Sequence, residues 1–175
     1  MAKLITPEIF QKNTAEDYLK AAIDTAEWID TLAIKTEYGR IWQALPEGQD
    51  GYREDVPLFT PEKHSWGFWN CQCQCCGTAG ILEHFAAMYE YTGEKEFYDY
   101  MIRTADVMLP DSDHRTPGLR TWYDSWWRTI PTRVVSYPGL YVGVAGCASS
   151  LLRTYAALTG KKLTNLYEYH FFEKF

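Results

Sequence analysis

An internal repeat constrains the fold of this chain more than any other feature of its sequence. Gly77-Thr-Ala-Gly80 recurs 66 residues later as Gly143-Val-Ala-Gly146. A Thr-Gly pair follows each copy at nearly the same distance, at Thr92 and at Thr159. Apolar residues have helical spacing in both intervening segments. Each copy therefore predicts a helix that begins after the glycine motif and ends at the Thr-Gly pair.

A second similarity lies ahead of each of these helices. Residues 17–27 match residues 96–106 at an offset of 79, and both segments predict amphipathic helices. The repeating unit is a helix, a variable loop and a second helix, which is typical of helical-hairpin repeat proteins. We predict an all-α fold in which two hairpins form an arc, with the helices that begin at Gly77 and Gly143 side by side on its inner face.

Capping and breaking residues mark the expected boundaries. Thr14 and Asp17 form a predicted capping box, and the helix that follows is expected to end before Gly39. A short segment around Trp42 is expected to be extended. The other predicted helices are 77–91, 94–109 and 143–159, and residues 111–138 are expected to be irregular. We predict one domain over residues 1–175, with repeat one at about 14–91, repeat two at about 94–160 and a tail at 161–175.

The glycines of the repeated motif have two interpretations. They allow the start of a helix to approach another backbone closely, or they present bare backbone N–H groups to a ligand. Recurrence in both units, whatever the local chemistry, favours close packing.

Four of the five cysteines lie within six residues, at positions 71, 73, 75 and 76. Cys73 and Cys76 form a Cys-x-x-Cys pair, a spacing that can surround one metal ion. Cys71, Cys73 and Cys75 alternate, so they share one face if the segment is extended. A helix beginning at Gly77 would lower the pKa of the Cys75 or Cys76 thiol. The pattern indicates a metal site or a reactive thiol; the alternative is a set of small thiols buried under aromatic rings.

Charge and composition exclude several classes of function. The formal net charge of −6 argues against a nucleic-acid partner and against an anionic membrane surface. No apolar run approaches the roughly 20 residues of a membrane span. No segment has the apolar core of a signal peptide, and clustered cysteines do not form a secreted disulfide framework. We therefore expect a cytoplasmic protein with reduced thiols.

Two further groups are candidate site residues. His64 precedes the cysteines by seven residues and could reach the same site. A second segment carries aromatic rings that could stack on a sugar, with a carboxylate and a guanidinium to bind hydroxyl groups; its alternative role is an aromatic plug between helices. The candidate substrate-binding residues of this segment are Trp122, Asp124, Trp126, Trp127 and Arg128.

The cysteine segment resembles a known family. Cys75-Cys76-Gly77-Thr-Ala-Gly80 is similar to the zinc-ligand turn of LanC-like proteins, the lanthionine synthetase cyclase family, whose usual form is Cys-His-Gly and whose minority form is Cys-Cys-Gly. Residues 137–146 resemble the Gly-Leu-x-x-Gly-x-Ala-Gly turn of the family's last repeat, and residues 21–29 resemble its outer helices. The similarity covers about residues 14–160.

The resemblance implies an α/α toroid and a zinc-dependent chemistry. The family adds a peptide cysteine thiol to a dehydrated Ser or Thr and forms a thioether. On this resemblance Cys75 and Cys76 are two zinc ligands. We predict that Cys71, Cys73, His64 or water completes the shell. The expected substrate is a peptide or a small thiol, and the catalytic residues are unknown.

The family has about seven hairpins, of which two fit here, and its third zinc ligand and acid/base histidine belong to earlier repeats. The chain thus resembles the C-terminal portion of such a protein, expected to be inactive alone and to self-associate or to pair with the missing repeats. The alternatives are a carbohydrate-active α/α toroid and a non-catalytic helical-repeat module that binds a peptide or a partner.

Overall fold

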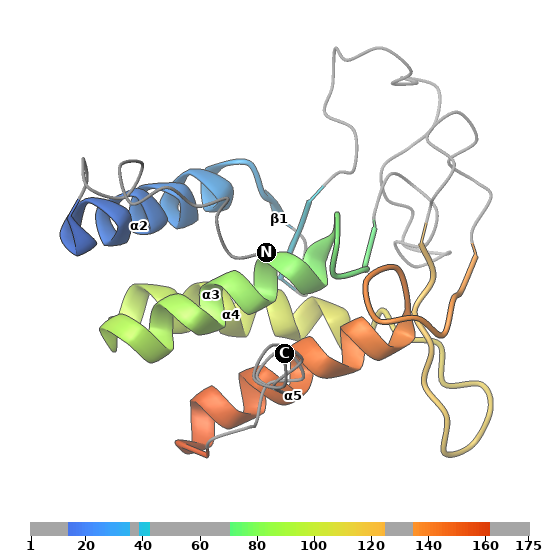
Figure 1. Cartoon of the computed structure of the whole chain (residues 1–175). Coiled ribbons are helices and arrows are strands. Elements are labelled where there is room, and N and C mark those ends of the chain that lie inside the picture. Colours follow the sequence, from blue (N-terminus) through green and yellow to red (C-terminus); the bar gives the residue numbers. More distant parts are fainter. Residues whose placement is uncertain (1–13, 36–38, 43–70, 125–134, 162–175) are drawn as a thin grey trace, which may run out of the picture. The chain divides into compact units, whose positions relative to one another are not determined.

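The computed structural model describes residues 14–35, 39–42, 71–124 and 135–161. The chain divides into two compact units, residues 1–32 and residues 33–175. The described part of the first unit consists mainly of one helix, and the described part of the second unit contains three helices and a small ribbon (Figure 1).

The first unit contains α2, Ala15–Thr31. Its predicted capping box is confirmed: the Thr14 hydroxyl accepts the Asp17 N–H at 3.2 Å, and the Asp17 carboxylate accepts the Thr14 N–H at 2.7 Å. The helix ends at Thr31, well before Gly39. Trp28 and Leu32 are exposed, with 61% and 53% of their surfaces accessible.

The second unit begins with a ribbon of two short antiparallel strands, β1 (Ile34–Lys35) and β2 (Arg40–Ile41). Gly39 enters β2 with a φ of 157°, and a Cβ on it would lie 2.1 Å from the Arg103 carbonyl oxygen. Only glycine allows this approach, so the strand packs directly on the helix that carries Arg103. The extended segment predicted before Trp42 is therefore present.

Two helices, α3 (Thr78–Thr92) and α4 (Lys95–Met108), form a hairpin. Gly93 joins them in the left-handed region, with a φ of 70°, and its N–H donates to the Tyr89 carbonyl at 2.8 Å. Phe85 is fully buried at the centre of the core, with its ring centroid 5.3 Å from that of Tyr100 and 6.0 Å from that of Trp42. Burial of such a side chain contributes roughly 2–3 kcal/mol to stability.

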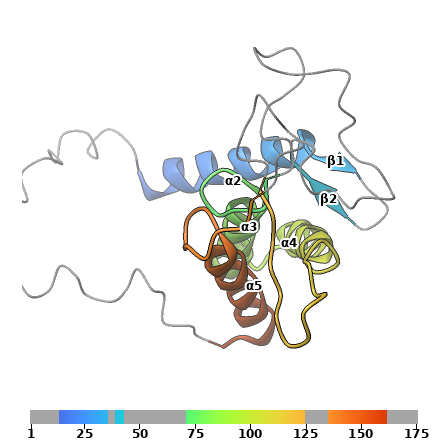
Figure 2. The same ribbon diagram turned by 90° about the vertical axis from the view of Figure 1, so that its right-hand side faces the viewer.

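Helix α5, Val144–Thr159, packs on a different face of α3 from α4 (Figure 2) and runs in the same direction as α3 (Figure 1). Near the start of α3, the Ser150 hydroxyl donates to the Glu83 carboxylate at 3.1 Å, and further along, Arg153 pairs with Glu90 at 3.1 Å. The two helices that begin at the repeated glycine motif therefore lie side by side, as predicted. The described residues are mainly helical, which confirms the all-α class.

No helix in the described ranges is both long enough and apolar enough to cross a bilayer.

Candidate metal centre

The cysteine segment forms a tight turn that leads into α3. The Thr78 N–H donates to the Cys71 carbonyl at 2.9 Å and the Ala79 N–H donates to the Gln72 carbonyl at 3.2 Å, so the turn folds back onto the start of the helix. A Cβ on Gly77 would lie 2.1 Å from the Cys71 oxygen. The close-packing interpretation of this glycine is confirmed, because no side chain fits there.

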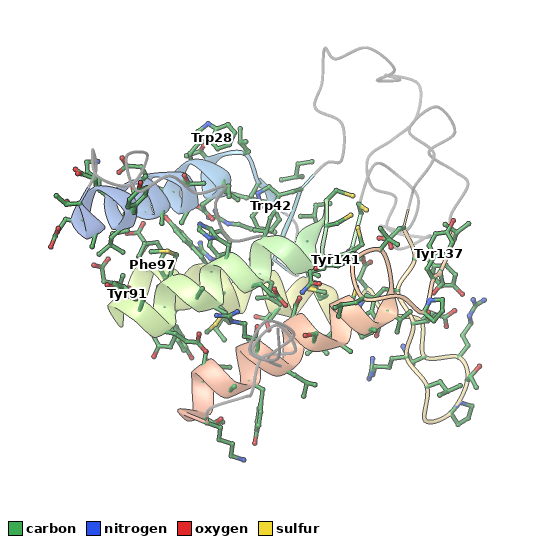
Figure 3. All side chains as sticks on the ribbon, in the orientation of Figure 1. Trp28, Trp42, Tyr91, Phe97, Tyr137 and Tyr141 are labelled. Carbon is green, nitrogen blue, oxygen red and sulfur yellow. The ribbon has the colours of Figure 1, made fainter. Side chains whose placement is uncertain are left out.

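Three thiols of this turn converge. The Cys71 and Cys73 Sγ atoms are 3.3 Å apart, and the Cys76 Sγ atom lies 3.7 Å from the first and 3.4 Å from the second. Figure 3 shows the sulfur atoms gathered at the turn into α3. A zinc–sulfur bond of about 2.3 Å in a tetrahedron places ligand sulfurs about 3.8 Å apart. The observed separations are close to that spacing.

Cys75 lies beside these three residues and is exposed. Its Sγ atom is 3.8 Å from that of Cys73 and 3.5 Å from that of Cys76. Its backbone N–H donates to the Tyr141 carbonyl at 2.9 Å, which fixes this part of the turn against the turn that precedes α5. His64 lies outside the described residues, and the predicted ligand set therefore stays a prediction.

The thiols of the turn differ in acidity. Thiol hydrogen bonds from Cys71 and Cys73 lower the pKa of Cys76 to about 4. Hydrogen bonds with Cys73 and Cys76, followed by burial, raise the pKa of Cys71 well above its usual range. Burial also raises the pKa of Cys75. Cys76, one of the two exposed thiols of the turn, is therefore the cysteine that most readily forms a thiolate.

A carboxylate from a distant part of the chain contacts this turn. Asp124 is 1% exposed, and its Oδ1 atom accepts the N–H groups of Gln72 at 2.6 Å and of Cys73 at 2.9 Å. The Cys71 thiol donates to the same oxygen at 3.4 Å. Burial, followed by the charge of Cys73, raises the pKa of Asp124 to about 6.

The fifth cysteine supports the turn from α5. Cys147 is fully buried, and its thiol donates to the Gln72 carbonyl at 3.1 Å. Burial raises its pKa well above that of a free thiol. The Gln72 amide in turn donates to the Asp111 carboxylate at 2.5 Å. The cysteine turn is thus held by residues from α5 and from the segment after α4.

The aromatic candidates for a sugar site have different positions. Trp122 is 4% exposed, and its indole N–H donates to the Met108 carbonyl at 2.8 Å, so this ring belongs to the core. Asp124 contacts the cysteine turn. The remaining candidates, Trp126, Trp127 and Arg128, lie outside the described residues.

Sequence reasoning missed the association of Asp124 and Cys147 with the cysteine turn. Asp124 is 52 residues from Gln72 and belongs to no periodic pattern, so no local signal links them. The repeat did carry a signal for Cys147, because this residue directly follows the second Gly-x-Ala-Gly motif.

The donor set fits a zinc ion. Cys71, Cys73 and Cys76 place their ligand atoms within 4.8 Å of one another. Thiolates are ligands that zinc prefers, and a cluster of closely spaced acidic groups gains from a divalent cation at its centre. Cys76 already has a pKa that allows it to bind as thiolate near neutral pH.

Comparison with known proteins identifies the family. Residues 63–161, which are 99 of the 175 residues, match the family described as lanthionine synthetase C-like protein. The comparisons with curated proteins and with solved structures give no match. The matched range includes the whole cysteine turn and helices α3, α4 and α5. The matched range covers more than half of the chain, and the chain therefore belongs to the lanthionine synthetase C-like family.

Proposed function

We propose that the turn of residues 71–76 binds zinc and that the bound metal serves to activate a thiol for addition to a dehydroamino acid, giving a thioether. The observation that carries this proposal is the convergence of Cys71, Cys73 and Cys76 within 4.8 Å in a member of this family. When bound, zinc supplies Lewis acidity that lowers the pKa of a thiol substrate.

The cysteines of the turn have different proposed roles in metal binding. Cys76 would hold the metal as a thiolate, and the buried Cys71 and Cys73 would be further ligands in their deprotonated form. The exposed Cys75 completes the shell or makes way for the substrate thiol. The positive end of the α3 dipole, at residues 77–80, favours the negative charge that collects here.

The proposed substrate is a peptide or a small thiol. We further propose that the two repeats at about 14–91 and 94–160 form part of an α/α toroid. Thioether formation then requires the additional hairpins that complete such a ring, and these residues alone are expected to be inactive.

Metal analysis of protein purified without chelator tests the site. We expect about one zinc ion per chain in the wild type and a loss of most of it in Cys76→Ser and in Cys71→Ser/Cys73→Ser. Cys147→Ser is the matched control, because Cys147 is buried like Cys71 and Cys73 but lies outside the turn, and a serine hydroxyl can still donate to the Gln72 carbonyl; this variant should keep its zinc. Equal zinc content in the wild type and in Cys76→Ser would show that this turn is not the zinc site.

A Cys75→Ala variant separates the two possible shells. If Cys75 is a ligand, as the family resemblance implies, the variant loses affinity as Cys76→Ser does. If Cys71, Cys73 and Cys76 are the permanent ligands, Cys75→Ala retains the metal.

A further inference from the structure

Asp124 holds the part of the cysteine turn that carries the two buried thiols. One carboxylate oxygen accepts the backbone N–H groups of Gln72 and Cys73 and the thiol of Cys71. Hydrogen bonds to a charged acceptor are stronger than neutral ones, and these are buried. The conformation that brings Cys71 and Cys73 together therefore depends on a residue from another part of the chain.

The carboxylate is itself held in place from two sides. The backbone of Asp124 exchanges two hydrogen bonds with Val135, at 2.9 and 3.1 Å. Two residues earlier, the Trp122 indole is tied to the Met108 carbonyl, the last residue of α4. The backbone that carries the Asp124 side chain is therefore anchored at Val135 and, through Trp122, at the end of α4.

The second carboxylate oxygen is unsatisfied. Asp124 Oδ2 is buried and has no hydrogen-bond partner among the described residues. Of the titratable groups described here, those that interact with Asp124 are thiols (Cys71, Cys73, Cys75 and Cys147), which carry no positive charge. A buried carboxylate without a cationic partner is costly for the folded state. A cation bound in the adjacent thiol cluster would offset that cost.

We propose that Asp124 is a positioning residue of the metal centre, which shapes the Cys71–Cys73 segment through its hydrogen bonds and strengthens cation binding through its charge. The inference rests on the proposed function for its second part only. Asp124 acts from outside the ligand shell: the group whose ligand atoms converge comprises Cys71, Cys73 and Cys76, and the Oδ1 atom already accepts two N–H groups. Partners that orient metal ligands in this way typically change metal affinity by about 10- to 100-fold when they are replaced.

Two substitutions separate the two contributions. Asp124→Asn keeps an oxygen that can accept the same N–H groups but removes the charge, whereas Asp124→Ala removes both. Asp113→Asn is the matched control, because Asp113 is a buried carboxylate in the same segment that pairs with Arg115 instead of the turn. Circular dichroism establishes that each variant is folded, and Asp124→Asn carries the test if Asp124→Ala does not fold.

The first measurement is zinc affinity, by competition with a chromophoric chelator, together with the absorption spectrum of the cobalt(II)-substituted protein. We expect Asp124→Asn to weaken zinc binding by about 10- to 100-fold with an unchanged thiolate-to-cobalt charge-transfer band. Asp124→Ala should weaken binding further and alter the band, and Asp113→Asn should match the wild type. Wild-type affinity in Asp124→Asn would overturn the role of the charge.

The second measurement needs no metal. In the metal-free protein, a maleimide should label Cys71 and Cys73 slowly in the wild type and in Asp124→Asn, and at least about tenfold faster in Asp124→Ala, because the loss of both N–H contacts releases the segment. Equal labelling in all three would overturn the positioning role. If the wild type binds no zinc, the proposed function and the role of the charge both fall, and the labelling result alone then supports or overturns positioning.

Discussion

Within one turn of six residues, neighbouring thiols have opposite chemical character. Cys71 and Cys73 are buried, with their Sγ atoms 3.7 and 3.4 Å from that of Cys76, whereas Cys75 and Cys76 face solvent. The difference arises from position alone, because all four residues have the same side chain. Such a set can present a ready thiolate while it keeps reserve ligands protonated.

The pH dependence of alkylation should report this asymmetry. The pKa of Cys76 is lowered to about 4, so its thiolate fraction is already complete near pH 6 and should not rise further by pH 8. The pKa of Cys75 is raised, so its thiolate fraction increases steadily over the same range. In metal-free protein, iodoacetamide labelling followed by peptide mass spectrometry should therefore show a flat rate for Cys76 and a climbing rate for Cys75. Parallel profiles for the two residues would contradict the assignment.

Asp113 provides a second prediction that depends on pH. Hydrogen bonds from Arg115, and a further one from the Tyr123 hydroxyl at 3.0 Å, hold the pKa of Asp113 well below its usual range. A carboxyl whose pKa is lower in the folded state stabilises the fold above its unfolded pKa of about 3.9, and this contribution is lost as the pH falls below that value. Asp113→Asn should thus lower the melting temperature at pH 7, with a smaller difference from the wild type at pH 3.

The exposed Asp106 on α4 is the control for this comparison. Asp106→Asn should have the same melting temperature as the wild type at both pH values. A pH-independent effect of Asp113→Asn would mean that its charge does not contribute.

At the scale of elements, the glycine motif determines where α3 and α5 begin. The turns that precede the two helices share a backbone hydrogen bond: the Thr78 N–H donates to the Cys71 carbonyl at 2.9 Å, and the Val144 N–H donates to the Tyr137 carbonyl at 2.8 Å. A Cβ on Gly143 would lie 2.0 Å from the Tyr137 oxygen, and one on Gly77 would lie 2.1 Å from the Cys71 oxygen. At the start of each helix, the glycine therefore lies so close to a backbone carbonyl oxygen that no side chain fits.

Alanine substitutions test this crossing. Gly77→Ala and Gly143→Ala should each lower the free energy of unfolding by about 2 kcal/mol or more, because the added methyl group collides with a backbone oxygen that cannot move aside. Gly139→Ala is the control in the same turn, since a Cβ there meets nothing within 4 Å. Urea denaturation of the three variants measures the difference. Gly77→Ala at wild-type stability would show that the turn is loose.

Much of the helical architecture could be predicted because it depends on local signals. Gly93 and Gly160 end α3 and α5 in the left-handed conformation that the Thr-Gly pairs predicted. The end of α2 was less predictable: the residues after Thr31 include good helix formers, and pairing of Ile34 with Ile41, rather than propensity, extends the chain there.

The candidate site was predictable only where its residues lie close together in the sequence. The clustering of Cys71, Cys73 and Cys76 follows from their proximity in the sequence. The contact of Asp124 with Gln72 spans 52 residues and depends on how the segment after α4 is anchored by Trp122. The sequence showed an aromatic and acidic segment, and its chemistry suggested a sugar as readily as a support for thiols.

At the scale of the whole molecule, α5 carries an exposed apolar face. Leu152, Tyr155 and Leu158 are 57%, 51% and 41% exposed and lie at helical spacing on this helix. Repeat arrays bury such faces against a neighbouring unit. The predicted self-association, or pairing with further repeats, would cover this face.

We expect the wild-type chain to self-associate at low micromolar concentration, as measured by light scattering. Leu152→Glu/Tyr155→Glu should shift it toward the monomer with unchanged helicity. Asp106→Lys, at an exposed position on α4, should leave association unchanged. A monomeric wild type with a sharp thermal transition would show that the described repeats need no further unit.

The matching turns before α3 and α5 have a consequence for how such a protein diversifies. Duplication of a hairpin supplies two copies of one backbone loop, and the contacts that shape it use main-chain atoms: Gly80 crosses the Gln74 carbonyl as Gly146 crosses that of Leu140. The loop can therefore exchange its side chains without losing its form. The turn before α3 carries thiols and the turn before α5 carries tyrosines, so one backbone conformation accommodates different side chains. Transplanting the cysteines into residues 137–142 would test whether the proposed metal site can be built a second time on the same kind of backbone turn.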